Sequence, residues 1–469
     1  MTTASTPENI DSRGTTRHLR VCVVGAGYVG LTAAACLSHL GHRVTCVESD
    51  AGRLAALQQG RMPIHEPGLD RLVAEGRAAD RLEFLADIAS ALAGVEVALL
   101  CVGTPPQATG EPDLSQLAAA ARQLARAAPG DLVVVVKSTV PPGSCEALEL
   151  VCADEAQPNV RIRVVSSPEF LRESRAVEDF LAPDRVVIGC DDDDDVAALV
   201  AHLYPAGSRI VHCDRRGAEL VKYAANTFLA IKISFANEVA QLCEALGTDA
   251  GTVLAGVGAD HRVGPAFLRP GPGYGGSCLP KDVAGFVALA DSVGTRALLA
   301  AAAEQQNAAA RQAVVTKLEM ILGPLEGRRV TVLGLAFKEG TDDTRDSPGL
   351  HVAAQLVAAG ADVRSYDPLV GTEPVPGRRA TSVAEACLGS EAVVIATSCD
   401  EFGAIDPTSL ALAMDGNVVF DAVGVCALHD WTAAGLTVYG VGRGTPLGFN
   451  PVVWTPLRWT GPIREVSRG

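Results

Sequence analysis

The glycine-rich stretch Gly271-Pro-Gly-Tyr-Gly-Gly-Ser-Cys-Leu-Pro-Lys-Asp282 places one cysteine just ahead of a lysine and an aspartate. Glycines let the backbone approach a ligand closely, and they leave Cys278 with few side-chain neighbours. Lys281 would favour the thiolate, which is the form that attacks a carbonyl carbon. The stretch therefore predicts either a reactive thiol or a glycine-rich surface turn that contains an unreactive cysteine.

A second set of residues suits the binding of a dinucleotide. An apolar run at Arg20–Val24 leads into Gly25-Ala-Gly-Tyr-Val-Gly30, which precedes a helical pattern and a further β run at Arg43–Val47. These glycines permit a tight turn, a close approach of a pyrophosphate to a helix N-terminus, and close packing of helix on strand. Glu48 ends the second run, where an acid accepts the ribose hydroxyls and repels a 2′-phosphate. The pattern predicts NAD binding in preference to NADP.

Composition narrows the class of protein. The chain has 469 residues, a formal net charge of −16 and 48% hydrophobic residues, which predicts an α/β protein of two or three domains. It has no Lys/Arg cluster with interleaved aromatic residues, so we expect no nucleic-acid partner. Thirteen cysteines without metal-ligand spacing predict reduced thiols, a cytoplasmic location and no metal site.

Three segments carry simpler expectations. Met1–Arg20 lacks an apolar core, which predicts a disordered tail and no signal peptide. No segment approaches the ~18 apolar residues of a membrane span, so we expect no membrane contact. The run Asp191–Asp195 could hold a cation, but it is more typical of a solvated loop, and we expect a loop.

Further β runs end in polar loops, which is where a parallel doubly wound sheet binds its ligands. Thr104 and Thr139 lie in the loops after two such runs, and either face a cofactor or cap the local backbone. A third run precedes Ser167-Pro-Glu-Phe-Leu-Arg-Glu173. Glu169 and Glu173 stand four residues apart there, which predicts one shared helical face serving either the helix dipole or catalysis.

A long helical pattern from Ala218 to Leu246 contains no proline. A helix of this length spans roughly 43 Å, which suggests a connector between two domains whose apolar faces form a dimer surface. Lys222 and Asn226 lie one turn apart on it and point to the same side. They are either solvent-facing residues or part of a site.

The opening pattern recurs after an alanine-rich helical region at Val283–Leu322. Arg328–Ala336 reads as a strand entering a glycine turn, and later β runs complete a second sheet. It lacks G-x-G-x-x-G, so we expect it to bind something other than NAD, with Lys338 and Arg345 placed for phosphates. The predicted fold class is α/β, with two Rossmann-like doubly wound domains joined by a long central helix. The predicted divisions are a tail at 1–19, an NAD-binding Rossmann domain at 20–212, a central helical dimerisation region with the cysteine loop at 213–322, a C-terminal Rossmann-like domain at 323–450 and a tail at 451–469.

With these residues assembled, the chain resembles the UDP-glucose/GDP-mannose dehydrogenase family over Arg20 to Tyr439, and most closely its members that oxidise UDP-glucose. The resemblance rests on seven motifs in the family's order: Val24-Gly-Ala-Gly-Tyr-Val-Gly30, Glu66-Pro-Gly-Leu69, Ser138-Thr-Val-Pro141, Ser167–Glu173, Lys222-Tyr-Ala-Ala-Asn226, Gly273–Asp282, and Ala336-Phe-Lys338 with Asp343-Thr-Arg345. It implies oxidation of C6 of a nucleotide-linked hexose from alcohol to carboxylate, with two NAD per turnover.

The resemblance also implies a role for each candidate catalytic residue. Cys278 would add to the C6 aldehyde as a thiohemiacetal, which is then oxidised to a thioester and hydrolysed. Lys222 and Asn226 would stabilise the oxyanion, and Asp282 would act as a base through a water. Glu169 would assist hydrolysis, and Thr139 would help to hold the water.

The same resemblance assigns the binding residues. The residues it places around NAD are Gly25, Ala26, Gly27, Tyr28, Val29, Gly30, Glu48, Arg53, Thr104, Thr139, Glu173, Lys281 and Arg345. The residues it places around the nucleotide sugar are Glu169, Phe170, Leu171, Arg172, Glu173, Lys222, Asn226, Arg262, Arg269, Gly273, Tyr274, Gly275 and Lys338. Arg262 would enter the site of a partner subunit, which implies an obligate homodimer or a higher homo-oligomer.

One departure from the family pattern bears on the substrate. Many members carry an arginine just after a strand that ends in Phe-Asp, whereas this chain reads Phe420-Asp-Ala-Val-Gly424, so that nucleotide contact is absent or supplied elsewhere. GDP-mannose and a UDP-N-acetylhexosamine therefore stay open as alternative substrates. A two-electron hydroxyacid dehydrogenase would not need Cys278. An NAD-responsive binding protein that had lost activity would have lost the cysteine, lysine and acid positions, all of which are present.

Overall fold

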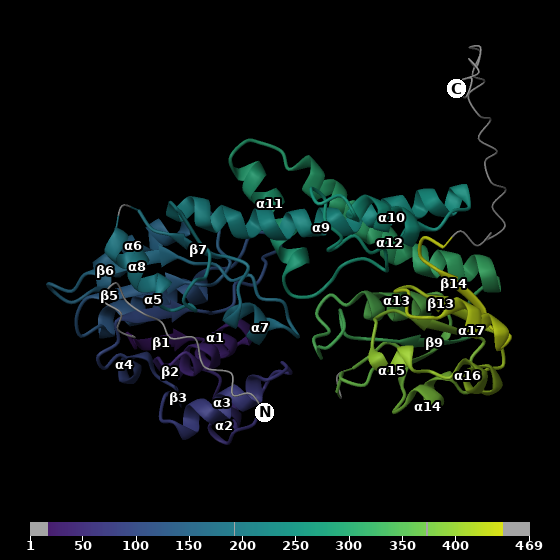
Figure 1. The fold of residues 1–469 in the computed structure, drawn as a ribbon, viewed down its shortest axis with the longest axis horizontal. Coiled ribbons are helices and arrows are strands. Elements are labelled where there is room, and N and C mark those ends of the chain that lie inside the picture. The colour runs from purple at the N-terminus through teal and green to yellow at the C-terminus, as the bar shows by residue number, and fades with distance from the viewer. Residues whose placement is uncertain (1–16, 192, 372–373, 444–469) are drawn as a thin grey trace, which may run out of the picture.

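The structure, a computed structural model, describes residues 17–191, 193–371 and 374–443. Two α/β units lie at opposite ends of the molecule, and a layer of long helices runs along one side of both (Figure 1). The predicted fold class is therefore confirmed. The predicted tails at 1–19 and 451–469 lie outside the described residues, apart from 17–19.

The N-terminal unit is built on one eight-stranded sheet. Its strand order is β3-β2-β1-β4-β5-β6-β7-β8, and every neighbouring pair is parallel except β6 and β7. Separate apolar clusters cover the two faces of the sheet, as a doubly wound fold requires. The strands are β1 (Arg20–Val24), β2 (Arg43–Val47), β3 (Leu82–Leu85), β4 (Val97–Leu100), β5 (Leu132–Val136), β6 (Ile162–Ser166), β7 (Val186–Gly189) and β8 (Ile210–Cys213). The helices are α1 (Tyr28–His39), α2 (Ala51–Gln58), α3 (Leu69–Ala78), α4 (Ile88–Ala91), α5 (Ser115–Ala127), α6 (Ser144–Glu155), α7 (Ala176–Leu181) and α8 (Asp194–Ala201).

The C-terminal unit repeats this plan on a smaller scale. Its six strands are all parallel, in the order β11-β10-β9-β12-β13-β14. The central strand β12 is buried along its whole length, as expected for a sheet covered on both faces. The strands are β9 (Arg329–Leu333), β10 (Asp362–Tyr366), β11 (Arg378–Arg379), β12 (Ala392–Ile395), β13 (Val418–Asp421) and β14 (Thr437–Gly440). The helices are α13 (Pro348–Ala358), α14 (Val383–Cys387), α15 (Asp400–Gly403), α16 (Pro407–Ala413) and α17 (Leu428–Ala433).

The predicted connector is α9, which runs over 32 residues from Arg215 to Leu246. Its N-cap Asp214 accepts a hydrogen bond from the Gly217 N–H, and the helix ends at Gly247, whose φ of 70° suits glycine. Three helices pack along it: α10 (Ala250–Gly258), α11 (Leu279–Ser292) and α12 (Leu298–Leu322). The alanine-rich region is thus two helices, with a break near Gly294.

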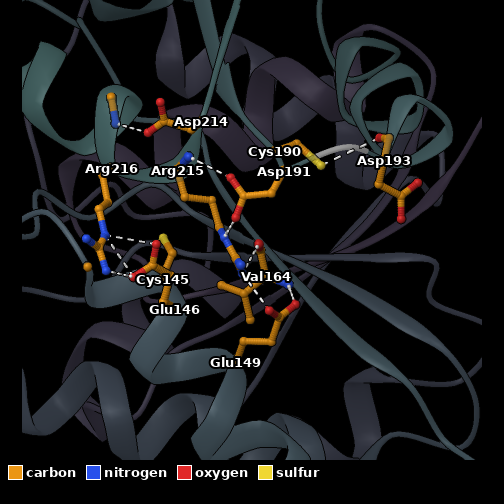
Figure 2. A network of polar contacts seen from close by, with 12 residues as sticks. Cys145, Glu146, Glu149, Val164, Cys190, Asp191, Asp193, Asp214, Arg215 and Arg216 are labelled. Atoms are coloured by element: carbon orange, nitrogen blue, oxygen red, sulfur yellow. Dashed lines mark hydrogen bonds and ion pairs between the residues drawn. The ribbon is translucent and has the colours of Figure 1, made fainter.

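An ion-pair network fastens the start of α9 to the N-terminal sheet (Figure 2). The Arg215 guanidinium donates to the carboxylates of Glu149 and Asp191, at 2.6 Å each. Asp193 caps α8 by accepting a hydrogen bond from the Val196 N–H. The prediction of a solvated loop over the aspartate run is therefore wrong at its C-terminal end, where Asp194 and Asp195 belong to α8.

The sequence predicts no metal site, no disulfide and no membrane-spanning helix, and the described part of the chain bears on each. No group of metal-ligating side chains with the geometry of a metal site occurs there. All thirteen cysteines are described, and none forms a disulfide. No described helix has the length and apolar character needed to cross a membrane.

Candidate active site

Two buried polar pairs meet where α9 passes the start of α11. The Lys222 ammonium donates to Glu169 Oε1 at 2.8 Å, and both side chains are less than a tenth exposed. The Asn226 amide donates to Asp282 Oδ2 at 2.5 Å, one helical turn further along α9. Lys222 and Asn226 therefore face a buried site and not solvent, and the Arg215 anchor two turns earlier fixes the face that they occupy.

Electrostatics keep the Lys222–Glu169 pair ionised. Burial alone would raise the pKa of Glu169, but the Lys222 ammonium, the Leu171 N–H and the Lys137 ammonium together lower it below 4.5. Burial would lower the pKa of Lys222, but the negative charges of Glu169, Cys278 and Asp282 raise it above 10.5. At neutral pH the site therefore holds an ammonium and a carboxylate in contact.

Cys278 is the N-cap residue of α11 and is half-buried. Burial raises the pKa of its thiol, with Glu169 and Asp282 adding to the rise and Lys222 opposing it. This differs from the expectation that Lys281 favours the thiolate, because Lys281 pairs with Asp282 instead. Cys278 thus needs a proton acceptor before it can attack a carbonyl carbon.

The segment that carries Glu169 and Glu173 is irregular, so the predicted helical face is wrong. Glu169 Oε2 accepts the N–H of Leu171 at 2.6 Å in a local turn, and α7 begins only at Ala176. The two carboxylates consequently point to different partners. Glu173 lies 3.3 Å from Ser277 Oγ, and burial beside Asp343 raises its pKa to about 7.

The glycine loop between β1 and α1 has the geometry that a dinucleotide requires. Gly25 has a φ of 98°, and a Cβ on Gly30 would lie 1.8 Å from the Gly25 carbonyl oxygen. A Cβ on Gly27 would instead project into open space, which a pyrophosphate could occupy. Glu48 Oε2 accepts hydrogen bonds from the Ala26 N–H at 3.2 Å and from Arg53 at 3.1 Å. These residues fit NAD.

Other predicted cofactor residues make contacts at the strand ends and beside Glu173. The Thr104 hydroxyl donates to the Thr139 carbonyl at 3.0 Å, where β4 and β5 end. Arg345 lies 3.7 Å from Glu173. The Tyr28 hydroxyl donates to Glu66, which also accepts the Ala176 N–H at 2.7 Å. Glu66 therefore ties the glycine loop to the segment after Glu173, a role that its sequence motif did not reveal.

The loop before Cys278 is held by two residues that sequence reasoning missed. Asn307 accepts the Tyr274 N–H at 2.7 Å and donates to the Tyr274 carbonyl at 3.0 Å. Arg311 donates to the same carbonyl at 2.6 Å and to Asp346. Both lie on α12, inside an alanine-rich pattern that gives no signal beyond helix. A Cβ on Gly275 would lie 2.1 Å from the Asp346 carbonyl oxygen, so this loop passes the C-terminal unit with no space for a side chain.

A cavity of about 540 Å³ joins these parts. The predicted site residues that line it are Val29, Glu169, Phe170, Leu171, Arg172, Glu173, Lys222, Asn226, Gly275, Cys278 and Lys338. Lys338 comes from the C-terminal unit and donates to the Glu173 carbonyl at 2.5 Å. Four predicted substrate residues do not line this cavity: Gly273, Tyr274, Arg269 and Arg262. Arg269 is exposed, and Arg262 is 77% exposed and bound to Asp260.

Three adjoining domains of one family match this chain. They are the NAD binding domain of the UDP-glucose/GDP-mannose dehydrogenase family at residues 19–206, its central domain at 216–309 and its UDP binding domain at 331–427. The match covers both α/β units and the helical layer between them.

Individual relatives match over most of their length. The UDP-glucose 6-dehydrogenase of Rhizobium meliloti is 41% identical, over 91% of this chain and 100% of the relative. That of Pseudomonas aeruginosa is 39% identical, over 91% and 98%. Among solved structures, a UDP-glucose dehydrogenase from Pyrobaculum islandicum has a TM-score of 0.85 at 37% identity, and covers 92% of this chain and 98% of its own. The chain therefore belongs to the UDP-glucose/GDP-mannose dehydrogenase family and is an NAD-dependent dehydrogenase.

Proposed function

We propose that this enzyme oxidises the C6 alcohol of UDP-glucose to the carboxylate of UDP-glucuronate, a four-electron oxidation. The observation that carries the proposal is the meeting of Cys278, the Lys222–Glu169 pair and Asn226 at one cavity, with Asp282 hydrogen-bonded to Asn226. A dehydrogenase that stops at the aldehyde has no use for a cysteine nucleophile. An enzyme that makes a carboxylate does use one, because a covalent adduct keeps the aldehyde in place for a second oxidation.

NAD bound at the Gly25–Gly30 loop supplies a hydride acceptor for C6. The chain's own residues manage charge and protons around that carbon. The Lys222 ammonium and the Asn226 amide are donors that lie beside Cys278, so they stabilise negative charge on the C6 oxygen. Asp282 is 1% exposed and accepts from Asn226, and in this proposal it takes a proton through a water.

The cysteine accounts for the second half of the reaction. Cys278 Sγ bonds to the aldehyde carbon, the C6–O π electrons move to oxygen, and the thiol proton passes to a base. Loss of a second hydride from C6 and of the proton on its oxygen converts this thiohemiacetal to a thioester, and a second NAD held at the Gly25–Gly30 loop would be the hydride acceptor. A water oxygen then bonds to C6, the C6–Sγ bond breaks, and Glu169 accepts the proton of the water. The buried position of Glu169 beside Lys222 supports this last role.

The relatives support UDP-glucose over the alternatives. Those at 41% and 39% identity are UDP-glucose 6-dehydrogenases, whereas a UDP-D-ManNAc dehydrogenase from Pyrococcus horikoshii is 29% identical with a TM-score of 0.80. The turn at Asp421 lacks the arginine expected in this pattern, but Arg443 reaches it from another segment, 3.3 Å from Asp421 Oδ2. A guanidinium thus lies beside this turn.

Comparison of kcat/KM for UDP-glucose, GDP-mannose and UDP-N-acetylglucosamine tests the substrate. We expect UDP-glucose to exceed each of the others by at least about 100-fold. GDP-mannose presents a different base to the buried polar groups of the nucleotide site, and the N-acetyl sugar places a larger group where glucose has its 2-hydroxyl. A higher kcat/KM for GDP-mannose or for the N-acetyl sugar would overturn the assignment.

We further propose that the enzyme is a cytoplasmic homodimer. On α9, Phe228, Phe235 and Leu242 are 60%, 46% and 61% exposed and stand seven residues apart, so they form one apolar stripe. A stripe of this kind on a helix surface is characteristic of an interface. The exposed Arg262 would reach the partner's cavity across it. Reduced thiols such as the thirteen unpaired cysteines suit the cytoplasm.

A further inference from the structure

A second buried lysine, Lys137, lines the active-site cavity. It directly follows β5 and is 4% exposed. Its ammonium donates to the Tyr204 hydroxyl at 2.7 Å and to the Pro168 carbonyl at 3.4 Å. Among the described residues, Lys137 forms no ion pair with a carboxylate, whereas Lys222 pairs with Glu169. A buried ammonium is costly to retain, so its position calls for a reason beyond packing.

The contacts of Lys137 converge on the residues that precede Glu169. Pro168, whose carbonyl accepts from Lys137, is the residue before Glu169. The Tyr204 hydroxyl lies 3.1 Å from Ser167 Oγ, one residue earlier. The Tyr204 ring is itself fixed by stacking on Phe180, with centroids 5.6 Å apart. Lys137 and Tyr204 thus hold the backbone that carries Glu169, while Lys222 holds its carboxylate.

The geometry points to Lys137 as a positioning residue that, with Tyr204, holds Glu169 in place as the proton acceptor for thioester hydrolysis. This inference rests on the proposed function, because it concerns its last step. In that step the water oxygen bonds to C6, the electron pair of the C6–Sγ bond stays on Cys278, and the water proton moves to Glu169. Without Lys137, the carboxylate would lose its backbone support and a nearby positive charge.

The charge of Lys137 acts in the same direction as its contacts. Lys137 helps Lys222 to lower the pKa of Glu169, so its removal should raise that pKa. The charged and titratable groups that face Glu169 are Lys222, Lys137, Arg185, Cys278 and Cys101. Replacement of Lys137 by an uncharged residue leaves the other four in place. The effect on Glu169 can therefore be read from the pH dependence of the reaction.

Three variants separate the effects of the charge of Lys137, its hydrogen bonds and its packing. Lys137→Met keeps most of the apolar stem and removes the charge and both hydrogen bonds. Lys137→Arg keeps a charge, and Tyr204→Phe removes only the hydroxyl that accepts from Lys137 and faces Ser167. If Lys137 serves only to fill space, Lys137→Met should lower the fraction of active enzyme without changing the pH profile.

The experiment measures kcat against pH, the NADH burst in the first turnover, and the intact mass of enzyme quenched in the steady state, with UDP-glucose as substrate. For Lys137→Met we expect the acidic limb of kcat to move to higher pH, because Glu169 loses a nearby positive charge. We expect kcat at pH 7 to fall about tenfold, because the carboxylate is no longer held in position. The burst should keep its rate, and a nucleotide-sugar adduct should accumulate on Cys278. Lys137→Arg should keep the wild-type limb, and Tyr204→Phe should shift it by a smaller amount in the same direction.

Two results would overturn the inference. One is an unchanged acidic limb in Lys137→Met, and the other is a slower burst without adduct, which would place its effect before hydrolysis. If Lys137→Met does not fold, an unmoved limb in Tyr204→Phe overturns the inference in its place. Failure of the proposed function would look different, because wild-type enzyme itself would then form no adduct on Cys278.

Discussion

At the scale of residues, Lys222 and Glu169 combine stability with chemistry in one buried pair. Because the pKa of Glu169 is lowered on folding, its contribution to stability is complete above 4.5 and is lost as the pH falls through the lowered value. Because the pKa of Lys222 is raised, its contribution is complete below 10.5 and is lost as the pH rises through the raised value. The pair therefore stabilises the fold across the whole neutral range.

Removal of Lys222 should show how much its ion pair with Glu169 contributes to stability. We expect Lys222→Met to lower the free energy of unfolding at pH 7 by about 3 kcal/mol, because it leaves the Glu169 carboxylate buried without its cation. The loss should shrink as the pH falls, because Glu169 without its cation takes up a proton more readily than in the wild type. Denaturant titrations at several pH values measure this. The double variant Lys222→Met/Glu169→Gln is the control, and a loss as large as that of the single variant would contradict the explanation.

The role of Cys278 calls for a different variant. Cys278→Ser should abolish uronate formation, because an alcohol at this position is a far weaker nucleophile than a thiolate. NAD binding should stay intact, since the Gly25–Gly30 loop and Glu48 lie on another element. Product chromatography and calorimetric titration with NAD measure the two properties. Normal turnover by the variant would refute Cys278 as the nucleophile.

At the scale of elements, the start of α9 determines where Lys222 lies. Arg215 is 14% exposed and bridges Glu149 and Asp191, whereas its neighbour Arg216 is 67% exposed and pairs only with Glu146 among the described residues (Figure 2). The two adjacent arginines thus form a natural comparison between a half-buried anchor and a surface ion pair.

We expect Arg215→Met to lower the free energy of unfolding by about 2 kcal/mol, less than for a fully buried pair because Glu149 and Asp191 are partly exposed. It should also lower kcat, since Lys222 lies two turns along the same helix. The matched variant Arg216→Met should change both far less. Equal effects of the two substitutions on unfolding and on kcat would argue against an anchoring role for Arg215.

Elements with strong periodicity could be predicted from the sequence, and irregular ones could not. The apolar strand runs and the proline-free pattern of α9 gave the two sheets and the connector, because burial imposes those periods. The segment at Ser167–Glu173 has helical spacing but is irregular, since the Glu169 carboxylate binds the Leu171 N–H and Ser174 adopts a φ of 67°. Asn307 and Arg311 were missed because their partners lie 33 to 37 residues away.

The same holds for the site: features set by neighbouring residues could be predicted, and features set by residues far apart in sequence could not. Glycine patterns report local backbone needs, so the turn at Gly25 could be placed from the sequence. The protonation of Cys278 depends on Glu169, Lys222 and Asp282, which come from three separate segments. Only the folded structure shows that burial, Glu169 and Asp282 raise the pKa of the thiol while Lys222 lowers it, and that Lys281 faces Asp282.

At the scale of the whole molecule, two α/β units and the helical layer share one cavity. Glu169 comes from the N-terminal unit, Lys222 and Cys278 from the helical layer and Lys338 from the C-terminal unit (Figure 1). NAD and the nucleotide sugar would thus approach Cys278 from opposite units. Any motion of one unit against the other would change the distance between the reacting groups.

The dimer proposal makes Arg262 a residue that acts in the partner's site. Cys278→Ser and Arg262→Ala should each be inactive alone, but mixed subunits should regain activity, because one site of each hybrid dimer then has both residues. Random exchange gives roughly a quarter of wild-type activity. Inactive mixtures despite subunit exchange would contradict action in the partner's site.

Light scattering of Phe235→Glu should show monomers, since a charge would enter the apolar stripe.

The most direct test of the four-electron oxidation is its stoichiometry. The formation of NADH can be followed by absorbance while the nucleotide sugar consumed and the acid formed are quantified by chromatography in the same sample. A cysteine adduct that retains the aldehyde predicts two NADH per UDP-glucose consumed, with UDP-glucuronate as the product. One NADH per UDP-glucose, with release of the aldehyde, would contradict the mechanism built on Cys278.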